Sequence, residues 1–464
     1  MKMLEKITKF LLKTLLFLLP WQTIFIAQEN FLNGAKWQYG TLGFYATEII
    51  LWLAVLFFIG WFWKTKTRGG APTHFSFTKD RLFLPCTTRV HGHVPLWYMV
   101  FIILFVLYSL LSGTWAINSA VALEHSRHIM EAMILFIMLF IGPLNFKEAV
   151  LCLTSGAILQ SFLGLWQFFT QSTFESKWFG LVAHPAWEAG SSIVASAEIG
   201  RWLRAYGSFA HPNIFGGYLA ICLILLIYLS LKIHKITALY WLKFIFLFSA
   251  LFFTFSRGAW IAFGAFLLAI FAYGIKNIRQ RRLPAGQAET SLWLEDKRTL
   301  SIPSYFLLLI IILGTINLPI LQTRLFSSSG NEIISISERT TGIKEALQII
   351  ATHPLFGIGI GNYTLASYKL NPNLPGWEYQ PVHNVFLLVL AELGLVGAII
   401  LFLIFVTYIN SLRDKIMPRF YFLLGLFGIL MIFDHYLFSF YSGLMLSAVY
   451  LGLISRPKHN ESCA

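Results

Sequence analysis

Long apolar runs separated by short polar and basic segments dominate the chain. A helix needs about 20 apolar residues to cross the hydrocarbon core of a bilayer, and the runs therefore predict about twelve membrane-spanning helices. The expected fold is an all-α integral membrane protein, a polytopic helical bundle in which residues 1–464 form a single membrane domain. The predicted spans cover residues 10–27, 41–63, 94–114, 128–145, 149–171, 213–231, 237–255, 259–275, 303–321, 384–408, 419–434 and 437–455.

The composition agrees with this membrane class. Of the 464 residues, 57% are hydrophobic and only 12% are charged, and the mean hydropathy is +0.68. Soluble domains contain roughly 25% charged residues, so a water-soluble fold would lack polar side chains for its surface. A net charge of +14 could suggest nucleic-acid binding. The basic residues, however, lie in short clusters between apolar runs, which is typical of cytoplasmic loops. We therefore expect membrane lipid, and no nucleic acid, as a partner.

The same basic clusters predict the orientation of the chain. Placing the N-terminal segment MKMLEKITK in the cytoplasm also places most of the 35 Lys and Arg residues there. Both termini are then cytoplasmic. The first apolar run lacks an A-x-A cleavage site, so we expect a retained span rather than a signal peptide. The four cysteines show neither metal-binding spacing nor a pattern that predicts disulfides: Cys86, Cys152, Cys222 and Cys463.

Two connections on the outer side are long, at about residues 171–212 and 322–383. In the second, the sequence ERTTGIKEALQIIATHP has apolar residues at the spacing of an amphipathic helix, which we expect to begin near Glu338 and to end at Pro354. We expect this helix to lie near the outer membrane surface, inside a large extracytoplasmic loop of residues 322–383.

Two arginines on the outer side are candidates for anion binding. Arg257, in FTFSRGAW, falls at the tight outer turn of a helical hairpin, where it either reaches lipid phosphate or binds a phosphate group bidentately. Arg339 falls at the expected start of the amphipathic helix, and a helix N-terminus favours anions. Pairing of Arg339 with Glu338 is the structural alternative.

A histidine at the outer boundary of a span is the candidate base. His383 and Asn384 lie where the outer loop enters the span at 384–408, and Gly394 and Gly397 follow in that span. Histidine is the side chain best suited to accept a proton near neutral pH. The structural alternatives are a backbone-bonded histidine at the membrane interface and glycines that allow close helix packing.

Further polar residues occur at outer helix ends. Arg204, His211 and Asn213 precede or begin the span at 213–231, and Asn213 is expected to cap that helix. Asp434 and His435 lie near the end of another span, as a buried pair or as support for a site.

One further acidic and histidine-containing segment, EHSRHIME, brings Glu124, His128 and Glu131 to helical spacing. We favour a solvated helix end over a metal site for these three residues. No motif indicates ATP hydrolysis or a catalytic zinc ion.

The motif around the candidate base resembles a known family. His383 and Asn384, nine residues, Gly394, two residues and Gly397 reproduce the H-N-x9-G-x-x-G pattern of the O-antigen ligase superfamily. That superfamily includes O-antigen ligases, O-antigen polymerases and bacterial protein O-oligosaccharyltransferases. FTFSRGAW resembles its Ser-Arg-Gly hairpin, and ERTTGIKEALQIIATHPLFGIGIGNY resembles its arginine, amphipathic helix and glycine-rich loop. By motif, the similar region covers residues 204–400.

The resemblance implies a metal-independent and cofactor-free lipid-linked oligosaccharide transferase of a bacterial inner membrane, with its active site on the periplasmic side. The implied donor is an undecaprenyl-diphosphate-linked glycan, and the acceptor is lipid A-core, another glycan or a protein. His383 would orient or deprotonate the acceptor hydroxyl, and Arg257 and Arg339 would hold the diphosphate. Arg204 would assist donor binding, and Asn384, Gly394 and Gly397 would support the site.

Several functions remain open at this point. The motifs are shared by ligases, polymerases and protein O-oligosaccharyltransferases, and we favour a ligase-like enzyme. A transporter or lipid-linked glycan flippase with twelve spans belongs to another class. Transporters tend to carry ionisable residues near the bilayer midplane and internal repeats. Here the polar groups gather at the outer helix ends, and the two halves do not resemble each other. An inactive membrane scaffold would leave the combination of Arg257, Arg339 and His383 unexplained.

Overall fold

The computed structural model describes residues 2–67, 77–78, 81–83, 93–94, 96–233, 235–281, 290–326, 330–412 and 418–456. Cys86 and Cys463 lie outside these residues. The α-helices of the described part are α1 (Lys2–Leu18), α2 (Ala46–Thr67), α3 (Leu96–Ser112), α4 (Ser119–Ile141), α5 (Phe146–Thr170), α6 (Pro212–Lys232), α7 (Ala238–Phe253), α8 (Arg257–Arg281), α9 (Thr290–Ile316), α10 (Leu318–Phe326), α11 (Gly330–Thr352), α12 (Tyr363–Leu370), α13 (Val385–Leu412), α14 (Pro418–Phe433), α15 (Tyr436–Ser439) and α16 (Tyr441–Ile454).

Short antiparallel strands occupy some of the connections. They pair as β1 with β4, β2 with β3, β5 with β6, β6 with β7, and β8 with β9. Their bounds are β1 (Ile24–Gln28), β2 (Phe31–Leu32), β3 (Ala35–Lys36), β4 (Leu42–Tyr45), β5 (Phe77–Thr78), β6 (Arg81–Phe83), β7 (His93–Val94), β8 (Ile193–Ser196) and β9 (Gly200–Leu203), with a 3-10 turn at Gln38–Gly40.

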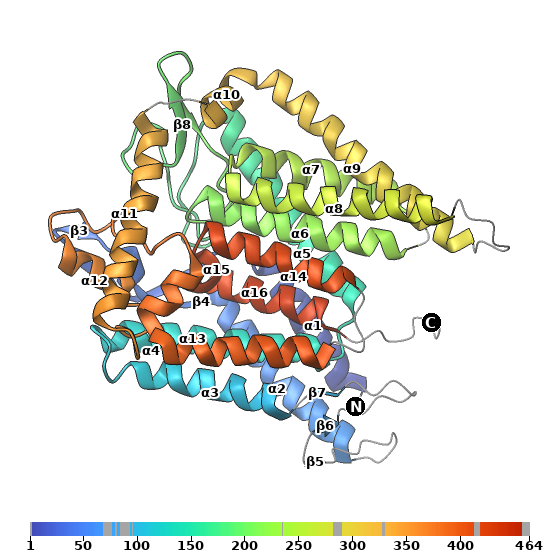
Figure 1. The fold of residues 1–464 in the computed structure, drawn as a ribbon, viewed down its shortest axis with the longest axis horizontal. Helices are drawn as coiled ribbons and strands as arrows, with labels where there is room; N and C mark the ends of the chain where they lie inside the picture. The colour runs from blue at the N-terminus through green and yellow to red at the C-terminus, as the bar shows by residue number, and fades with distance from the viewer. Residues whose placement is uncertain are drawn as a thin grey trace.

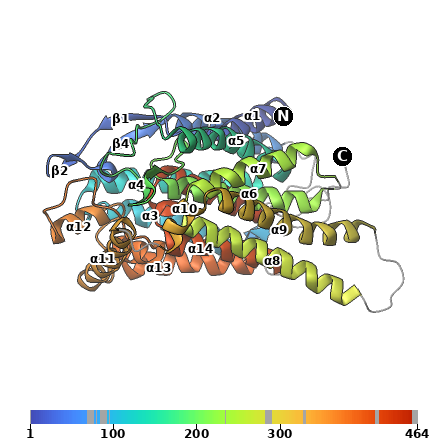
Figure 2. The ribbon, with the colours of Figure 1, turned by 90° about the horizontal axis from the view of Figure 1, so that it is seen from above.

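The long helices lie side by side in one bundle (Figure 1). Helix α1 begins and α16 ends at one end of this bundle, and both views show this arrangement (Figures 1 and 2). At the opposite end, α11 and α12 and the β8–β9 hairpin cover the ends of the long helices (Figure 1). We call this the capped end. The start of α1 and the end of α16 therefore lie at one end of the bundle, and α11 and α12 lie at the other (Figure 1).

Six helices in the described residues are long and apolar enough to cross a membrane: Ala46–Thr65, Phe146–Thr170, Pro212–Lys232, Arg257–Lys276, Lys297–Ile316 and Val385–Asn410. Four shorter apolar helices accompany them: Trp97–Ser112, Ala238–Phe253, Leu423–Phe433 and Tyr441–Ile454. The chain is thus a mostly helical, multi-pass membrane protein. The number of twelve spans stays a prediction.

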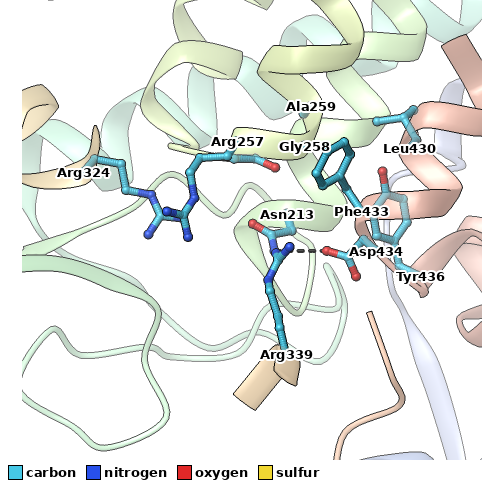
Figure 3. Close-up of a pocket in the computed structure, with 11 residues that line it drawn as sticks. Asn213, Arg257, Gly258, Ala259, Arg324, Arg339, Leu430, Phe433, Asp434 and Tyr436 are labelled. Atoms are coloured by element: carbon cyan, nitrogen blue, oxygen red, sulfur yellow. Dashed lines mark hydrogen bonds between the residues drawn. The ribbon is translucent and has the colours of Figure 1, made fainter. Parts of the chain in front are cut away.

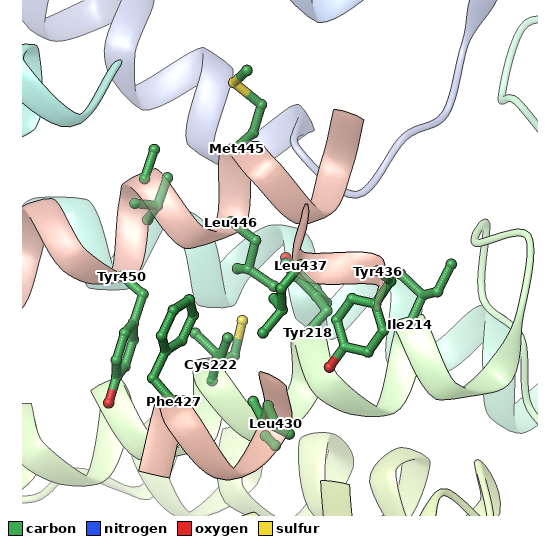
Figure 4. Packing of buried hydrophobic residues seen from close by; sticks show 14 of the residues in the cluster. Ile214, Tyr218, Cys222, Phe427, Leu430, Tyr436, Leu437, Met445, Leu446 and Tyr450 are labelled. Atoms are coloured by element: carbon green, nitrogen blue, oxygen red, sulfur yellow. The ribbon is translucent and has the colours of Figure 1, made fainter. Parts of the chain in front are cut away.

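The buried fraction of each helix distinguishes the helices that face outward from the helix at the centre of the bundle. The apolar window of α9 is only 22% buried, and Leu307, Leu308 and Ile311 project from it. Such contiguous exposed apolar surface suits a helix that contacts lipid. The window of α6 is 89% buried, as expected for a helix that is apolar on every side. Side chains of α14, α15 and α16 pack on α6 around Tyr218 and Cys222 (Figure 4).

The structure corrects the first predicted span. Helix α1 ends at Leu18, two residues before Pro20, although the apolar run continues to residue 27. Proline disfavours continuation of a helix because it lacks a backbone N–H and its ring clashes with the preceding turn. The rest of the run forms β1, which pairs with β4. The span expected at 10–27 is therefore replaced by a helix over Lys2–Leu18 and a strand.

A helix is present where the amphipathic helix was expected, but its predicted start is wrong. Helix α11 begins at Gly330 and ends at Thr352, shortly before Pro354. Arg339 therefore lies in the middle of α11, and the expected contribution of a helix N-terminus to anion binding does not apply to it. Arg257 is instead the residue that begins a helix, α8.

The first glycine of the motif, Gly394, lies at a kink in α13. Gly394 has φ +63° inside the helix, and a Cβ there would lie 2.3 Å from the Leu355 carbonyl oxygen. The backbone N–H of Leu395 donates to the Pro354 carbonyl, and the backbone N–H of Gly359 donates to the Glu392 carbonyl. The loop after α11 thus satisfies backbone groups that the kink leaves open.

Candidate functional site

A pocket at the capped end gathers side chains from helices far apart in the sequence (Figure 3). Its empty space is about 310 Å³, part of which is open to the surroundings. The lining residues are Asn213, Ser256, Arg257, Gly258, Ala259, Arg324, Arg339, Leu430, Phe433, Asp434 and Tyr436. Three arginines and one carboxylate are among these residues, and a set of guanidinium groups suits a polyanionic group.

A strained turn positions Arg257. Between α7 and α8, Phe255 adopts φ +49°, which non-glycine residues rarely adopt outside constrained sites. The Arg204 Nε donates to the Thr254 carbonyl at 2.6 Å, and the Arg324 Nε donates to the Phe255 carbonyl at 3.0 Å. Two arginines therefore hold the turn that begins α8 and directs Arg257 into the pocket.

Arg324 is a pocket residue that sequence reasoning missed. It lies on α10, is only 8% exposed, and its guanidinium faces that of Arg257 (Figure 3). In the sequence it follows the apolar run at 303–321, where a basic residue reads as an ordinary boundary of a span. No local signal distinguishes it, because its place beside Arg257 depends on how α10 folds over the bundle.

Arg339 enters the same pocket from α11, opposite Arg257 and close to Asn213 and Asp434 (Figure 3). Two of the three residues expected to converge, Arg257 and Arg339, therefore line one pocket. His383 does not line it, but it contacts the pocket through Asp434: the His383 Nδ1 lies 3.2 Å from Asp434 Oδ1.

Asp434 joins the histidine to the arginine pocket. Its Oδ2 accepts a hydrogen bond from Asn213 Nδ2 at 3.0 Å, and its Oδ1 accepts from the His435 backbone N–H at 2.8 Å. Asn213 in turn accepts from Arg204 at 2.7 Å. A chain of hydrogen bonds therefore runs from Arg204 through Asn213 and Asp434 to His383, and it fixes the orientation of the imidazole.

The environment of Asp434 keeps its carboxyl group ionised. Burial by itself would raise its pKa, but the interaction with His383, which includes a hydrogen bond, outweighs burial and holds the pKa well below its usual range. A carboxylate can only accept hydrogen bonds, so the His383 Nδ1 must carry the proton and donate to it. In the neutral imidazole, Nε2 is then the nitrogen that carries the lone pair. Burial lowers the pKa of His435 to about 3, so that ring is neutral.

Arg204 lies beneath the pocket rather than in its lining. It is 4% exposed, and its three nitrogens donate to the Thr254 carbonyl, to Ser192 Oγ at 2.6 Å and to Asn213 Oδ1. Asn213 is not the helix cap that the sequence suggested. The cap of α6 is His211, whose Nδ1 accepts from the Asn213 N–H at 3.1 Å.

The other motif residues act on the backbone around His383. Asn384 precedes α13, and its Oδ1 accepts from the Leu387 N–H at 3.0 Å, as an N-terminal cap does. Gly397 allows Tyr108 to approach α13, because a Cβ there would lie 3.0 Å from the ring. Tyr108 donates to the Leu393 carbonyl at 2.8 Å, beside the kink at Gly394.

In the described part of the chain, two groups of side chains have possible metal-ligand atoms within 4.8 Å of one another. One is His383, Asp434 and His435, in which both Asp434 oxygens already accept hydrogen bonds from protein groups. The other, Glu48, His128 and Glu131, lies outside the pocket.

The fold and this site define a multi-pass helical membrane protein with a cationic pocket at one end of its bundle. Residues 242–402 match the sequence model of the O-antigen ligase family. This match confirms, for this region, the resemblance inferred from the motifs. The region contains Arg257, Arg324, Arg339 and His383. The match supports a glycosyltransferase of the ligase or polymerase type in general. None of the curated proteins matches the chain.

Proposed function

We propose that this protein transfers a glycan from an undecaprenyl-diphosphate carrier to an acceptor hydroxyl on the extracytoplasmic face of a bacterial inner membrane. The observation that carries the proposal is the convergence of Arg257, Arg324 and Arg339, from three separate helices, next to an imidazole bound to a carboxylate. The family match supports a lipid-linked glycan donor and a glycan acceptor in general.

In the proposed reaction, the acceptor oxygen attacks the anomeric carbon of the donor sugar. The bond from that carbon to the diphosphate oxygen breaks, and its electron pair leaves with the diphosphate. The hydroxyl proton passes to His383 Nε2, while Asp434 stabilises the imidazolium that forms. Arginine side chains, rather than a metal ion, offset the charge that develops on the leaving diphosphate. A single displacement inverts the anomeric carbon.

Arg204, Asn384 and the two motif glycines have supporting roles in this proposal. Arg204 is a positioning residue because it holds both the Thr254 carbonyl and Asn213. Asn384, Gly394 and Gly397 fix the entry of α13 and therefore the place of His383. Within the class we favour a ligase-like enzyme that uses lipid A-core or a related glycan as acceptor. Polymerisation and protein O-glycosylation are the alternatives that an acceptor panel separates.

The test is an in vitro transfer assay with purified full-length protein, an undecaprenyl-diphosphate glycan and a panel of acceptors. His383→Ala should lower turnover by roughly 100-fold or more, while donor binding survives. Arg257→Ala and Arg339→Ala should weaken donor binding as well. Arg201→Ala, an exposed arginine on β9, is the matched control and should behave as wild type. Full turnover in His383→Ala would refute the assigned base. Movement of the donor across liposomes without transfer would favour a flippase.

A further inference from the structure

A second cluster of charged side chains lies between α2 and α4, away from the arginine pocket. Glu48, at the start of α2, is 3% exposed, and on α4 His128 is 6% and Glu131 is 0% exposed. The sequence favoured a solvated helix end for the α4 residues, and burial of His128 and Glu131 shows that this interpretation was wrong. Buried charged groups need partners within the protein.

A single arginine, Arg127, compensates only part of the negative charge of this cluster. Arg127 contacts Glu48 Oε2, and its guanidinium lies 2.8 Å from Glu124 Oε1 and 3.4 Å from Glu131 Oε1. Three carboxylates face one guanidinium, so with every carboxyl ionised and His128 neutral the cluster has a net charge of −2 (three negative, one positive). Enclosing an uncompensated charge of that size is costly.

Glu131 is the carboxylate whose negative charge lacks a full set of partners. Its Oε1 accepts from Trp52 Nε1 at 3.0 Å and from Arg127. Its Oε2 is buried and has no hydrogen-bond partner among the described residues. Protonating Oε2 would remove the charge but would create a buried O–H donor with no acceptor in this part of the structure. A bound cation would satisfy both the oxygen and the charge.

The neighbouring imidazole belongs to the same group of possible ligands, because one ligand atom each of Glu48, His128 and Glu131 lies within 4.8 Å of the other two. His128 Nε2 lies 3.3 Å from Arg127 Nη2, and a guanidinium can only donate, so Nε2 is the unprotonated nitrogen. It also lies 3.7 Å from Glu48 Oε1. The 3.7 Å between His128 Nε2 and Glu48 Oε1 is close to the separation of two ligands on one metal ion with bonds of about 2.0–2.2 Å. A metal ion at Nε2 would take the lone pair that now faces Arg127.

We propose that Glu48 Oε1, His128 Nε2 and Glu131 Oε2 bind one divalent cation. The ion would bring the net charge of the cluster to zero. Two carboxylate oxygens and an imidazole suit a first-row divalent ion such as Zn²⁺, with a water molecule as its fourth ligand. Arg127 and Trp52 hold the other carboxylate oxygens and so act as the outer shell that orients the ligands.

The site has a structural role, since it joins α2 to α4 near the start of α16. Tyr441, the first residue of α16, stacks on Tyr45 at 4.3 Å and lies 5.1 Å from the His128 ring. On α4, His125 Nε2 lies within hydrogen-bonding distance, 3.0 Å, of the Ser439 carbonyl oxygen on α15. The cation would therefore stabilise the elements that follow Asp434, without contacting the reacting groups.

The test uses tag-free, full-length protein in detergent, dialysed against EDTA and then titrated with Zn²⁺. Metal content is measured by mass spectrometry, and stability by the melting temperature. We expect about one retained Zn²⁺ per chain, a lower melting temperature after EDTA treatment, and recovery on adding Zn²⁺. Mn²⁺ and Ca²⁺, tested separately, should restore it less well.

Variants separate this proposal from its alternatives. Glu131→Gln should abolish Zn²⁺ retention and the effect of Zn²⁺ on melting. Glu148→Gln is the matched control, because Glu148 also has a buried oxygen without a hydrogen-bond partner in the described structure but pairs with Lys13 at another place. Trp52→Phe, a milder change, should weaken Zn²⁺ affinity by roughly 10–100-fold. Wild-type protein that retains no Zn²⁺ and melts identically with EDTA and Zn²⁺ would overturn the site. Unchanged Zn²⁺ binding in Glu131→Gln would overturn it equally.

Discussion

At the scale of single residues, the main feature is the crowding of like charges. Arg257 and Arg324 face each other in one pocket, and Arg339 approaches from the other side. Like charges held together are unfavourable unless an anion lies between them. Asp434, the carboxylate among the lining residues, accepts hydrogen bonds from Asn213 and His383. The three arginines are therefore poised for a polyanionic ligand such as a diphosphate.

This arrangement predicts a specific role for Arg324. Arg324→Ala should raise the donor concentration needed for half-maximal transfer by about 10–100-fold, because a hydrogen bond to a charged group contributes about 1.5–3 kcal/mol. Arg324→Lys should recover only part of the loss, since lysine lacks the Nε–H that donates to the Phe255 carbonyl. Transfer kinetics at varied donor concentration provide the measurement, with Arg201→Ala as control. An unchanged half-saturating concentration in Arg324→Ala would remove Arg324 from the donor site.

A second prediction at this scale concerns pH and Asp434. The pKa of its carboxyl is depressed in the folded protein, so its contribution to stability is present above the unfolded pKa of about 4 and is lost as the pH falls through the folded value. Asp434→Asn should therefore melt below wild type near pH 7, and the difference should shrink as the pH falls below about 4. Melting curves across pH test this, and a difference that grows on acidification would contradict it.

At the scale of elements, the kink in α13 connects the large loop to the candidate base. The loop after α11 docks on backbone groups opened at Gly394, and the same helix begins two residues after His383. The H-N-x9-G-x-x-G spacing thus encodes one helix entry and one break, separated by about two and a half turns of helix. Both features depend on the loop meeting the helix at a fixed place.

Gly394→Ala tests this element directly. An alanine at φ +63° is strained, and its Cβ would collide with the Leu355 carbonyl, so we expect a loss of about 1–3 kcal/mol and a lower melting temperature. Gly425→Ala on α14 is the matched control, because a Cβ there meets no atom within 4 Å. That variant should be neutral or slightly more stable. Equal melting temperatures for the two variants would show that the kink is not required.

At the scale of the whole molecule, the ends of α1 and α16 lie opposite the large loop and the pocket (Figures 1 and 2). The distribution of basic residues predicts that the first side is cytoplasmic. The pocket would then open on the extracytoplasmic side, where an acceptor glycan is reached without crossing the bilayer.

Accessibility labelling tests this orientation. In a cysteine-free background, Thr340→Cys on α11 should react with a membrane-impermeant maleimide added to intact spheroplasts, because Thr340 is exposed at the capped end. Thr237→Cys, exposed before α7, should react only after the membrane is permeabilised. The reverse labelling pattern would place the pocket in the cytosol and would exclude the proposed acceptors.

The sequence by itself determined the class of protein, because apolar run length and charge distribution act locally and need no tertiary contacts. It also indicated Arg257, Arg339 and His383, since their motifs are contiguous in the chain. Tertiary structure decided what lies beside them. Arg324 joins the site from a segment that carries no local signal, and packing brings Asp434, which the sequence offered as support for a site, next to His383. Burial turned an apparently solvated Glu131 into part of a charge cluster. Local pattern specifies where a helix lies, whereas the charge and hydrogen-bond partners of a side chain depend on which distant helices pack against it.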